Sequence, residues 1–277
     1  MEKVSNILPF FKRELLGIAE QREITSWAYI TINHLLDFNR SDCIINSNQE
    51  LSSEVVTELH KIIKDLKINK PLQYILGETE FYGLEFKVNK HTLIPRPETE
   101  ELVDWILQED FESALDIGTG SGCISISLAK NSNAKISAMD VSVEALIIAK
   151  ENAKRNQVKI DFIQEDILKL DILPKVDLIV SNPPYVLNSE KVKMKDNVLE
   201  FEPSLALFVE DDNPLVFYKK IAELAFKSLN VNGKLFFEIN EQFGNEIMSI
   251  LSQTGFVHIE LKKDVNDKER MIRAVKK

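Results

Sequence analysis

The stretch that decides the fold is Val176-Asp177-Leu178-Ile179-Val180-Ser181-Asn182-Pro183-Pro184-Tyr185. Its first five residues are apolar except for Asp177, which is typical of a parallel strand covered on both faces. Pro183 and Pro184 lack the N–H that a ladder needs, so they end the strand. A residue that precedes proline is held in an extended conformation, which restricts Asn182 and Pro183. The stretch therefore predicts a buried strand that ends in a stiff corner.

Further apolar strands alternate with helical patterns around this stretch. The expected strands are residues 114–117, 135–139, 159–163, 177–180, 234–239, 257–261 and 271–275. The expected helices are residues 98–108, 124–130, 142–155, 214–229 and 241–253. Such alternation predicts an α/β fold with a doubly wound, mostly parallel, seven-stranded sheet. Ligands of these sheets bind beyond the carboxyl ends of the strands, near the point where the strand order reverses.

The first part of the chain has a different pattern, with apolar residues at helical spacing. Three amphipathic helices are expected, with apolar stripes at Phe10, Phe11, Leu15 and Ile18, at Trp27, Ile30, Leu35 and Leu36, and at Leu51, Val55, Leu59, Ile62, Ile63 and Leu66. Residues 84–89 then alternate apolar with polar, and Phe81-Tyr82-Gly83 before them favours a hairpin. The sequence predicts a small helical bundle (1–70), a hairpin linker (71–95) and an α/β domain (96–277).

Composition excludes several classes of protein. The 277 residues carry a formal net charge of −10, which disfavours nucleic acid as the main partner because a sequence-independent grip on phosphates needs clustered Lys and Arg. The two cysteines, Cys43 and Cys123, lie far apart, so neither a disulfide framework nor a zinc site is expected. No signal peptide and no apolar run long enough to span a membrane is apparent. We expect a cytoplasmic protein.

The stiff corner is suited to holding a planar NH2 group. The side chain of Asn182 and the main-chain carbonyls of Asn182 and Pro183 can hold fixed directions, and Tyr185 offers a flat face beside them. An amide or exocyclic amine is a poor nucleophile because its lone pair is delocalised. Two acceptors on its hydrogens would orient that lone pair toward an electrophile. A strand-terminating turn without chemistry is equally compatible with Asn-Pro-Pro-Tyr alone.

A second group of polar residues and glycines follows the earlier strands. The first strand runs into Asp116-Ile117-Gly118-Thr119-Gly120-Ser121-Gly122, where glycines let the backbone turn tightly and approach a ligand. This spacing differs from the Gly-x-Gly-x-x-Gly of dinucleotide sites and disfavours an NAD-linked dehydrogenase. Asp140 ends the next strand, where a carboxylate can accept hydrogen bonds from both ribose hydroxyls of an adenosine. Asp166, after the third strand, can accept from the adenine amino group.

Together these residues predict a pocket for S-adenosylmethionine. Its sulfonium carries positive charge and it has no phosphates, so an acidic pocket suits it. Asn182 ends the following strand, where the activated methyl group would point. The cofactor half and the acceptor half of a methyl transfer are therefore expected to face each other.

The sequence resembles the class I methyltransferases and, more closely, the HemK/PrmC family of protein-glutamine methyltransferases. The segments that carry the resemblance are Pro71-Leu72-Gln73-Tyr74-Ile75-Leu76-Gly77, Phe81-Tyr82-Gly83, Ile94-Pro95-Arg96-Pro97-Glu98-Thr99-Glu100, the Asp116 to Gly122 loop and Asn182-Pro183-Pro184-Tyr185. The resemblance covers nearly the whole chain, and it implies that residues 1–70 form a substrate-recognition domain and residues 96–277 the S-adenosylmethionine-dependent methyltransferase domain. It implies a Rossmann-like fold and methyl transfer from S-adenosylmethionine to the side-chain amide of the glutamine in the Gly-Gly-Gln motif of peptide chain release factors. S-adenosylhomocysteine is the product.

The resemblance also implies roles for particular residues. Contacts to the cofactor are expected at Gly118, Thr119, Gly120, Ser121, Gly122, Asp140, Asp166, Ile167 and Asn182. Contacts to the substrate glutamine are expected at Asn182, Pro183, Pro184 and Tyr185, of which Asn182, Pro183 and Tyr185 are the catalytic candidates. No metal is expected. The expected partner is a release factor, with neither nucleic acid nor membrane bound, and the protein is expected to be a monomer.

Two alternatives remain open from the sequence. A nucleic-acid amino methyltransferase could use the same corner on a flipped base, but it predicts a basic groove and a target-reading segment, and neither is apparent. A binding module would hold the cofactor or a ribosomal partner without catalysis. The long connection 186–213 carries both charge signs and resembles a substrate-docking loop.

The chain also departs from the family pattern in three loops. Asn240 and Asn266 stand where the family usually has glycine, and Asn213-Pro214-Leu215 replaces a Gly-Leu turn. Because Asn tolerates positive φ better than most residues, both turns at the asparagines are expected to be kept.

Overall fold

The computed structural model describes residues 2–194 and 196–277, which form two compact units. We call them the helical unit and the sheet unit. The helical unit comprises the residues up to Gly77 together with α9 (Asp196–Phe201), and the sheet unit comprises Glu78–Met194 and Glu202–Lys277. Their boundary at Gly77 lies inside the segment 71–95 that the sequence analysis assigns to a linker.

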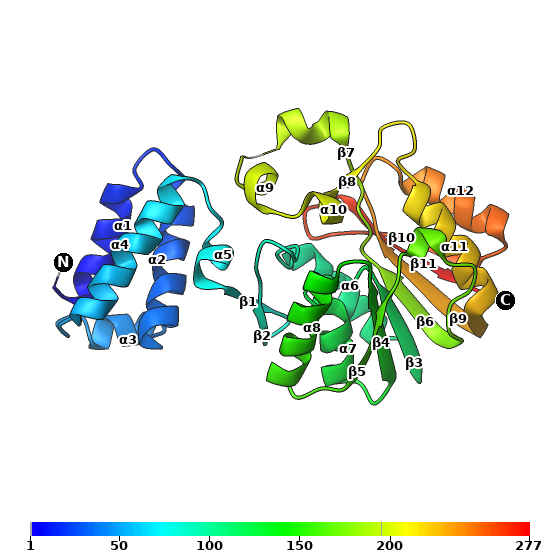
Figure 1. The fold of residues 1–277 in the computed structure, drawn as a ribbon, viewed down its shortest axis with the longest axis horizontal. Coiled ribbons are helices and arrows are strands. Elements are labelled where there is room, and N and C mark those ends of the chain that lie inside the picture. The colour runs from blue at the N-terminus through cyan, green and yellow to red at the C-terminus, as the bar shows by residue number, and fades with distance from the viewer. Residues whose placement is uncertain (1, 195) are drawn as a thin grey trace. The chain divides into compact units, whose positions relative to one another are not determined.

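Short helices around an apolar core make up most of the helical unit (Figure 1). They are η1 (Val4–Asn6), α1 (Ile7–Glu14), α2 (Gln21–Leu36), α3 (Arg40–Ile45), α4 (Ser53–Lys67) and α5 (Leu72–Leu76). Ser52 caps the start of α4, because its hydroxyl accepts a hydrogen bond from the N–H of Val55. The predicted stripe of α4 is buried at Leu59, Ile62, Ile63 and Leu66. Helix α1 ends before Ile18, which is exposed, so the first expected stripe extends too far.

A β-hairpin begins the sheet unit. Strands β1 (Glu78–Phe81) and β2 (Leu84–Lys87) pair antiparallel around Tyr82-Gly83. Both turn residues have positive φ, 51° at Tyr82 and 69° at Gly83, as a two-residue type I′ turn requires. The hairpin predicted at this position is therefore confirmed.

The sheet has seven strands in the order β10-β11-β9-β6-β3-β4-β5. The strands are β3 (Ser113–Ile117), β4 (Lys135–Asp140), β5 (Ile160–Gln164), β6 (Val176–Ser181), β9 (Leu229–Glu238), β10 (Val257–Lys263) and β11 (Glu269–Val275). β11 pairs antiparallel with both β9 and β10, whereas the pairs among β9, β6, β3, β4 and β5 are parallel. The predicted doubly wound, mostly parallel seven-stranded sheet is confirmed.

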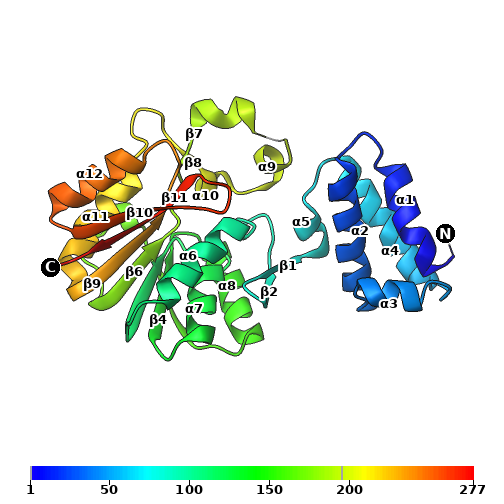
Figure 2. The ribbon, with the colours of Figure 1, turned by 180° about the vertical axis from the view of Figure 1, so that it is seen from behind.

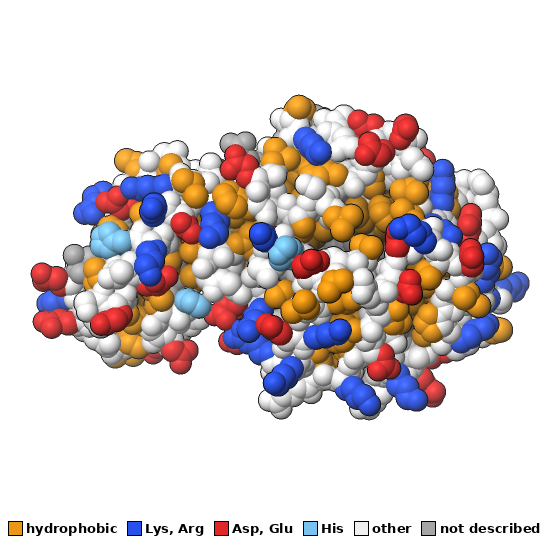
Figure 3. All heavy atoms as spheres, viewed as in Figure 1, with side chains coloured by type: hydrophobic (Ala, Val, Ile, Leu, Met, Phe, Trp, Pro, Cys, Tyr) orange, Lys and Arg blue, Asp and Glu red, His pale blue; other side chains and the backbone are white. Residues whose placement is uncertain are grey.

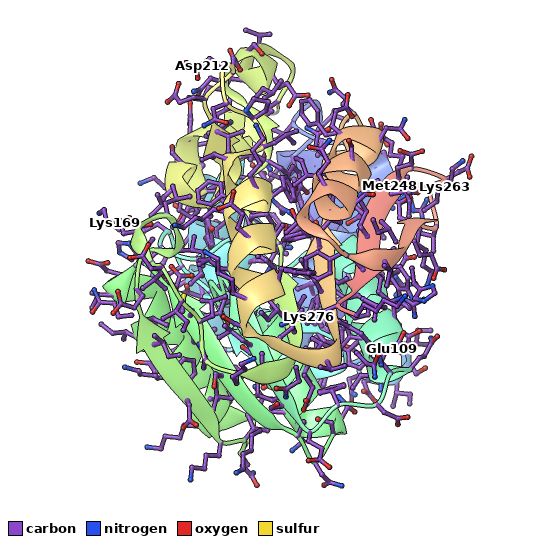
Figure 4. All side chains as sticks on the ribbon, turned by 90° about the vertical axis from the view of Figure 1, so that its right-hand side faces the viewer. Glu109, Lys169, Asp212, Met248, Lys263 and Lys276 are labelled. Carbon is purple, nitrogen blue, oxygen red and sulfur yellow. The ribbon has the colours of Figure 1, made fainter. Side chains whose placement is uncertain are left out.

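Helices cover both faces of this sheet (Figures 1 and 2). α6 (Pro97–Leu107), α7 (Cys123–Asn131) and α8 (Val143–Arg155) lie on one face, and α11 (Val216–Ser228) and α12 (Gly244–Thr254) lie on the other. Figure 4 shows α11 beside α12, which carries Met248. In β6 the side chains of Leu178 and Val180 enter one core and Ile179 enters the other. All three are fully buried, which explains why the strand is apolar on both faces.

Asn152 of α8 ties the hairpin to the loop that follows β3. Its side-chain nitrogen donates to the carbonyls of Lys87 (3.0 Å) and Ser121 (2.9 Å), and its oxygen accepts from the N–H of Lys87 (2.7 Å). The residue is fully buried. One amide therefore satisfies three backbone groups on two segments.

The connection 186–213 has structure of its own. It contains β7 (Val186–Leu187), η3 (Asn188–Lys193), α9, α10 (Ser204–Leu207) and β8 (Phe208–Val209), and β7 pairs with β8. Lys195, within the predicted docking loop, lies outside the described residues. Among the helices of the described chain, none is long and apolar enough to cross a membrane.

The two asparagines that the resemblance predicts to replace glycines have ordinary backbone conformations. Neither Asn240 nor Asn266 has positive φ, and in the last hairpin it is Asp267 that does (62°). These turns therefore do not use the tolerance of asparagine for positive φ.

Candidate active site

A cavity of about 440 Å³ lies at the carboxyl ends of β3, β4, β5 and β6. β3 and β6 are neighbours in the sheet, and the chain leaves β3 toward β4 and β5 before it returns to β6. This is the point where the strand order reverses, which is where ligands of doubly wound sheets bind. Most residues of segments 117–124, 139–145, 165–168 and 181–184 line it, but Gly122 does not, so a cofactor contact at Gly122 stays a prediction.

The loop after β3 presents its backbone to this cavity. Gly118, Gly120 and Gly122 have φ of 75°, 55° and 83°, values that residues with a Cβ rarely adopt. No heavy atom lies within 4 Å of the position that a Cβ would take on Gly118 or Gly120, whereas on Gly122 it would lie 2.8 Å from Cδ1 of Ile126. The first two glycines thus leave the loop open, and the third lets the loop pack on α7.

Asp140 lies at the end of β4 and lines the cavity beside this loop. One carboxylate oxygen accepts a hydrogen bond from the N–H of Gly120 (2.8 Å), and the other accepts from the N–H of Ser142 (2.9 Å). Burial raises the pKa of Asp140. Each oxygen retains a lone pair, so the carboxylate can still accept two hydroxyl groups from a ligand.

Asp116, beneath the loop, is fully buried, and sequence reasoning gave it no role of its own. Its Oδ2 accepts from the hydroxyl of Thr119 (2.6 Å) and from the N–H of Ser125 (3.2 Å). Its Oδ1 has no hydrogen-bond partner among the described residues. Burial raises the pKa of Asp116 to about 6. The loop therefore rests on a carboxyl group that takes up a proton readily.

Asp166 and Ile167 lie at the third corner, after β5, and both line the cavity. The carboxylate of Asp166 accepts from the N–H of Leu168 (3.0 Å) and pairs with the ammonium of Lys169 (3.1 Å). Figure 4 labels Lys169 on this segment. Glu165, which the sequence analysis did not single out, also lines the cavity.

The corner after β6 completes this side of the cavity. Ser181, the last residue of β6, donates its hydroxyl to the carbonyl of Ile117 (2.7 Å), which joins the end of β6 to the end of β3. Asn182, Pro183 and Pro184 line the cavity. The structure thus brings together the glycine loop, the two predicted aspartates and most of the Asn-Pro-Pro-Tyr corner.

Tyr185 takes a different position from its neighbours. It is not among the residues that line the cavity, and its ring packs against the core beneath α11 and α12. Its hydroxyl donates to Oε1 of Glu238 (3.2 Å), and its main-chain carbonyl accepts from the side-chain nitrogen of Asn240 (3.2 Å). That Tyr185 contacts a substrate stays a prediction.

Two buried glutamates were missed by sequence reasoning. Glu238 accepts from the hydroxyl of Thr99 (2.6 Å) as well as from Tyr185. Glu202 accepts from the guanidinium of Arg96 (2.6 Å) and from the N–H of Ile94 (3.4 Å), and its side chain is 1% exposed. The partners of both glutamates lie at least 53 positions away in the chain, so no local sequence pattern predicts them.

In the part of the chain that the structure describes, no group of three or more His, Cys, Asp or Glu side chains is placed to hold a metal ion.

The sheet order, the reversed β11 and the glycine loop at the switch point define a Rossmann-like class I methyltransferase. Residues 97–201 match the family described as "Methyltransferase small domain". Among solved structures, the chain is similar to a methyltransferase from Pyrococcus furiosus, with a TM-score of 0.54, 21% identity and coverage of 81% of this chain and 99% of that one. At this identity the likeness shows the fold alone.

Sequence comparison identifies the family within this class. Residues 14–77 match the family described as "PrmC N-terminal domain". The chain is 47% identical to a release factor glutamine methyltransferase of Flavobacterium psychrophilum over 98% of both chains. It is 41% identical to the protein of the same name in Bacteroides thetaiotaomicron over 98% of this chain and 99% of that one. The chain therefore belongs to the release factor glutamine methyltransferase family, as its resemblance to HemK/PrmC proteins predicted.

The raised pKa of Asp116 predicts how stability depends on pH. The folded state holds the proton up to pH 6 or so, whereas the unfolded chain releases it near 3.8, so the contribution of Asp116 to stability is full below 3.8 and is lost as pH rises through about 6. Asp116→Asn removes this loss. Relative to wild type, its free energy of unfolding should rise by roughly 2 kcal/mol between pH 4.5 and pH 7.5, measured by urea denaturation without ligand.

Asp177→Asn is the control for this prediction. The pKa of Asp177 is lowered, chiefly by a hydrogen bond from Asn230, so no comparable gain is expected over the same interval. Parallel stability profiles for wild type and Asp116→Asn would contradict the prediction.

Proposed function

We propose that this protein transfers a methyl group from S-adenosylmethionine to the side-chain amide nitrogen of the glutamine in the Gly-Gly-Gln motif of peptide chain release factors. The observation that carries the proposal is the end-to-end identity of 47% with a relative that bears the name of this activity. The cavity supports it, because the glycine loop and the Asn182 corner line the same space.

The cavity residues suit S-adenosylmethionine. Gly118 and Gly120 leave open space beside the backbone, and Asp140 offers acceptors suited to ribose hydroxyls. The proposed contacts are Gly118, Thr119, Gly120, Ser121, Gly122, Asp140, Asp166, Ile167 and Asn182. Bound there, the cofactor supplies a methyl group activated by a sulfonium, and its product is S-adenosylhomocysteine. The acidic lining favours this cation over phosphate-bearing ligands.

On the acceptor side, the protein's task is to orient a weak nucleophile. The side-chain oxygen of Asn182 and the carbonyl of Pro183 accept hydrogen bonds from the two amide hydrogens, and Pro184 bounds the same wall. Tyr185 follows Pro184 and packs its ring against the core. Its proposed role is to pack on the plane of the amide once the substrate glutamine is bound. Held in this way, the nitrogen lone pair points toward the methyl group, so the rate gain comes from position and preorganised dipoles.

The same proposal names the partner and the compartment. The macromolecular partner is a release factor acting in translation, which places the reaction in the cytoplasm. Acidic and basic side chains are interspersed over the visible face of the sheet unit (Figure 3). This distribution gives no support to the nucleic-acid alternative, which predicts a basic groove. A monomer remains the expected state.

Mass spectrometry of a release factor incubated with the protein and S-adenosylmethionine tests the proposal. A single methyl group should appear on the Gly-Gly-Gln glutamine and should be absent from a factor in which that glutamine is replaced. Methyl transfer to RNA or DNA instead would favour the nucleic-acid alternative. Cofactor binding without transfer to either substrate would favour a binding module.

Asn182→Ala should lower kcat on the release factor by about 100-fold or more, as expected when one preorganised polar contact is removed. The matched control is Asn131→Ala, because the side chain of Asn131 donates only to the nearby carbonyl of Ser127 and lies outside the cavity lining. Its turnover should match wild type. Near wild-type turnover of Asn182→Ala would remove Asn182 from the proposed role.

Gly118→Ala should weaken binding of S-adenosylhomocysteine by at least about 10-fold, because the new methyl group would occupy ligand space. Gly83→Ala is the control, since Gly83 has a similar φ and equally open surroundings but lies in the hairpin turn. Both substitutions should cost about 1 kcal/mol of stability from positive φ. Calorimetric titration distinguishes them, and equal affinities for both variants would argue against a cofactor contact at Gly118.

A further inference from the structure

Glu238 is a fully buried carboxylate that the proposed reaction does not use directly. It is the last residue of β9, next to Phe237, which pairs with Ser181 at the end of β6. Its side chain is 1% exposed and does not line the cavity. A buried carboxylate at this position needs partners, because an unpaired charge in the interior is costly.

Its two oxygens accept hydrogen bonds from two different segments at the active site. Oε2 accepts from the hydroxyl of Thr99, which lies in the first turn of α6 and lines the cavity. Oε1 accepts from the hydroxyl of Tyr185, which follows the cavity-lining Pro184. One carboxylate thus joins the wall formed by α6 to the corner formed by Asn182-Pro183-Pro184-Tyr185.

The carboxylate is itself held in place. The fully buried Tyr218 donates its hydroxyl to the main-chain carbonyl of Glu238 (3.1 Å), and its ring packs edge-on against Phe237. Arg270 provides positive charge that partly offsets the effect of burial on the pKa of Glu238. Both hydroxyl partners donate, and an ionised carboxylate accepts from both.

We propose that Glu238 is a positioning residue that fixes the direction of Tyr185 and its separation from Thr99, and so shapes the acceptor half of the cavity. The inference rests on the proposed function, because it assigns Glu238 a part in amide transfer without any contact to substrate. A purely structural role would lower stability alone. A positioning role lowers kcat while affinity for the cofactor, which binds at the glycine loop, stays unchanged.

Glu238→Gln, Tyr185→Phe and the double variant test this inference, assayed with intact release factor. Glu238→Gln keeps the shape but replaces one acceptor by an NH2 group that faces a hydroxyl. It should lower kcat about 10- to 100-fold, the scale of a small misplacement of reacting groups. The dissociation constant of S-adenosylhomocysteine should stay within about twofold. Tyr185→Phe removes the hydroxyl that Glu238 holds, so if Glu238→Gln acts through the same contact, the double variant should be no slower than the slower single variant.

Two further comparisons test whether the loss of kcat is specific to the hydrogen bonds of Glu238. Thr99→Ser, which keeps the hydroxyl, should retain wild-type kcat, whereas Thr99→Val should lower it. Asp177→Asn removes a carboxylate that accepts from Ser113 at the other end of β6, and its kcat should be unchanged. If Glu238→Gln does not fold, Tyr185→Phe and Thr99→Val decide the matter, and wild-type kcat in both would overturn the inference.

Other outcomes also count against it. A folded Glu238→Gln with kcat within twofold of wild type would overturn the inference, as would effects that multiply in the double variant. If the wild-type protein transferred no methyl group, the proposed function would fail separately. The hydrogen bond between Tyr185 and Glu238 would then be tested by the free energies of unfolding of wild type, Glu238→Gln, Tyr185→Phe and the double variant. Strictly additive changes in these free energies would overturn the positioning role.

Discussion

The site depends on the pairing of β3 with β6 at the centre of the sheet. The chain leaves β3 in one direction and comes back to β6 on its other side, so a glycine loop and a proline corner begin at adjacent strand ends. At the carboxyl end of this strand pair, the hydroxyl of Ser181 donates a hydrogen bond to the carbonyl of Ile117, 64 positions earlier in the chain. The residues proposed to contact the cofactor and the acceptor lie around this junction. Parallel pairing explains the location, because it brings the carboxyl ends of all these strands to one edge.

Several acidic side chains lie at this edge of the sheet, and Asp116 and Glu238 among them are fully buried. Asp116, Asp140 and Glu238 lie on β3, β4 and β9, and burial raises the pKa of each. Their hydrogen bonds come from backbone N–H groups and hydroxyls, which donate without adding full positive charge. The acidic side chains that line the cavity itself are Asp140, Glu165 and Asp166, beside Arg96, and this acidic excess suits a sulfonium ligand better than a phosphate. This agrees with a glycine spacing unlike that of dinucleotide sites.

Much of this arrangement could be predicted from the sequence, for identifiable reasons. Strands buried on both faces are apolar runs, and prolines and glycines mark where they end, so β6, its corner and the loop after β3 were recognisable. Helices α3 and α5 were missed because six and five residues are too few to show a period. Glu238, Glu202 and Asn152 were missed because each acts through hydrogen bonds between distant segments. Asn152 looks like a surface residue in a helical pattern, yet it is fully buried.

The Asn-Pro-Pro-Tyr corner shows why such distant bonds matter. Proline restricts the backbone of Asn182 and Pro183, but it cannot place the corner relative to the rest of the cavity. That placement comes from Tyr185, whose hydroxyl is held by Glu238 and whose carbonyl is held by the side chain of Asn240. The resemblance to the HemK/PrmC family predicts glycine at position 240, and glycine has no side chain to make this bond. The side chain of Asn240 therefore supports the corner from behind, at ordinary backbone φ.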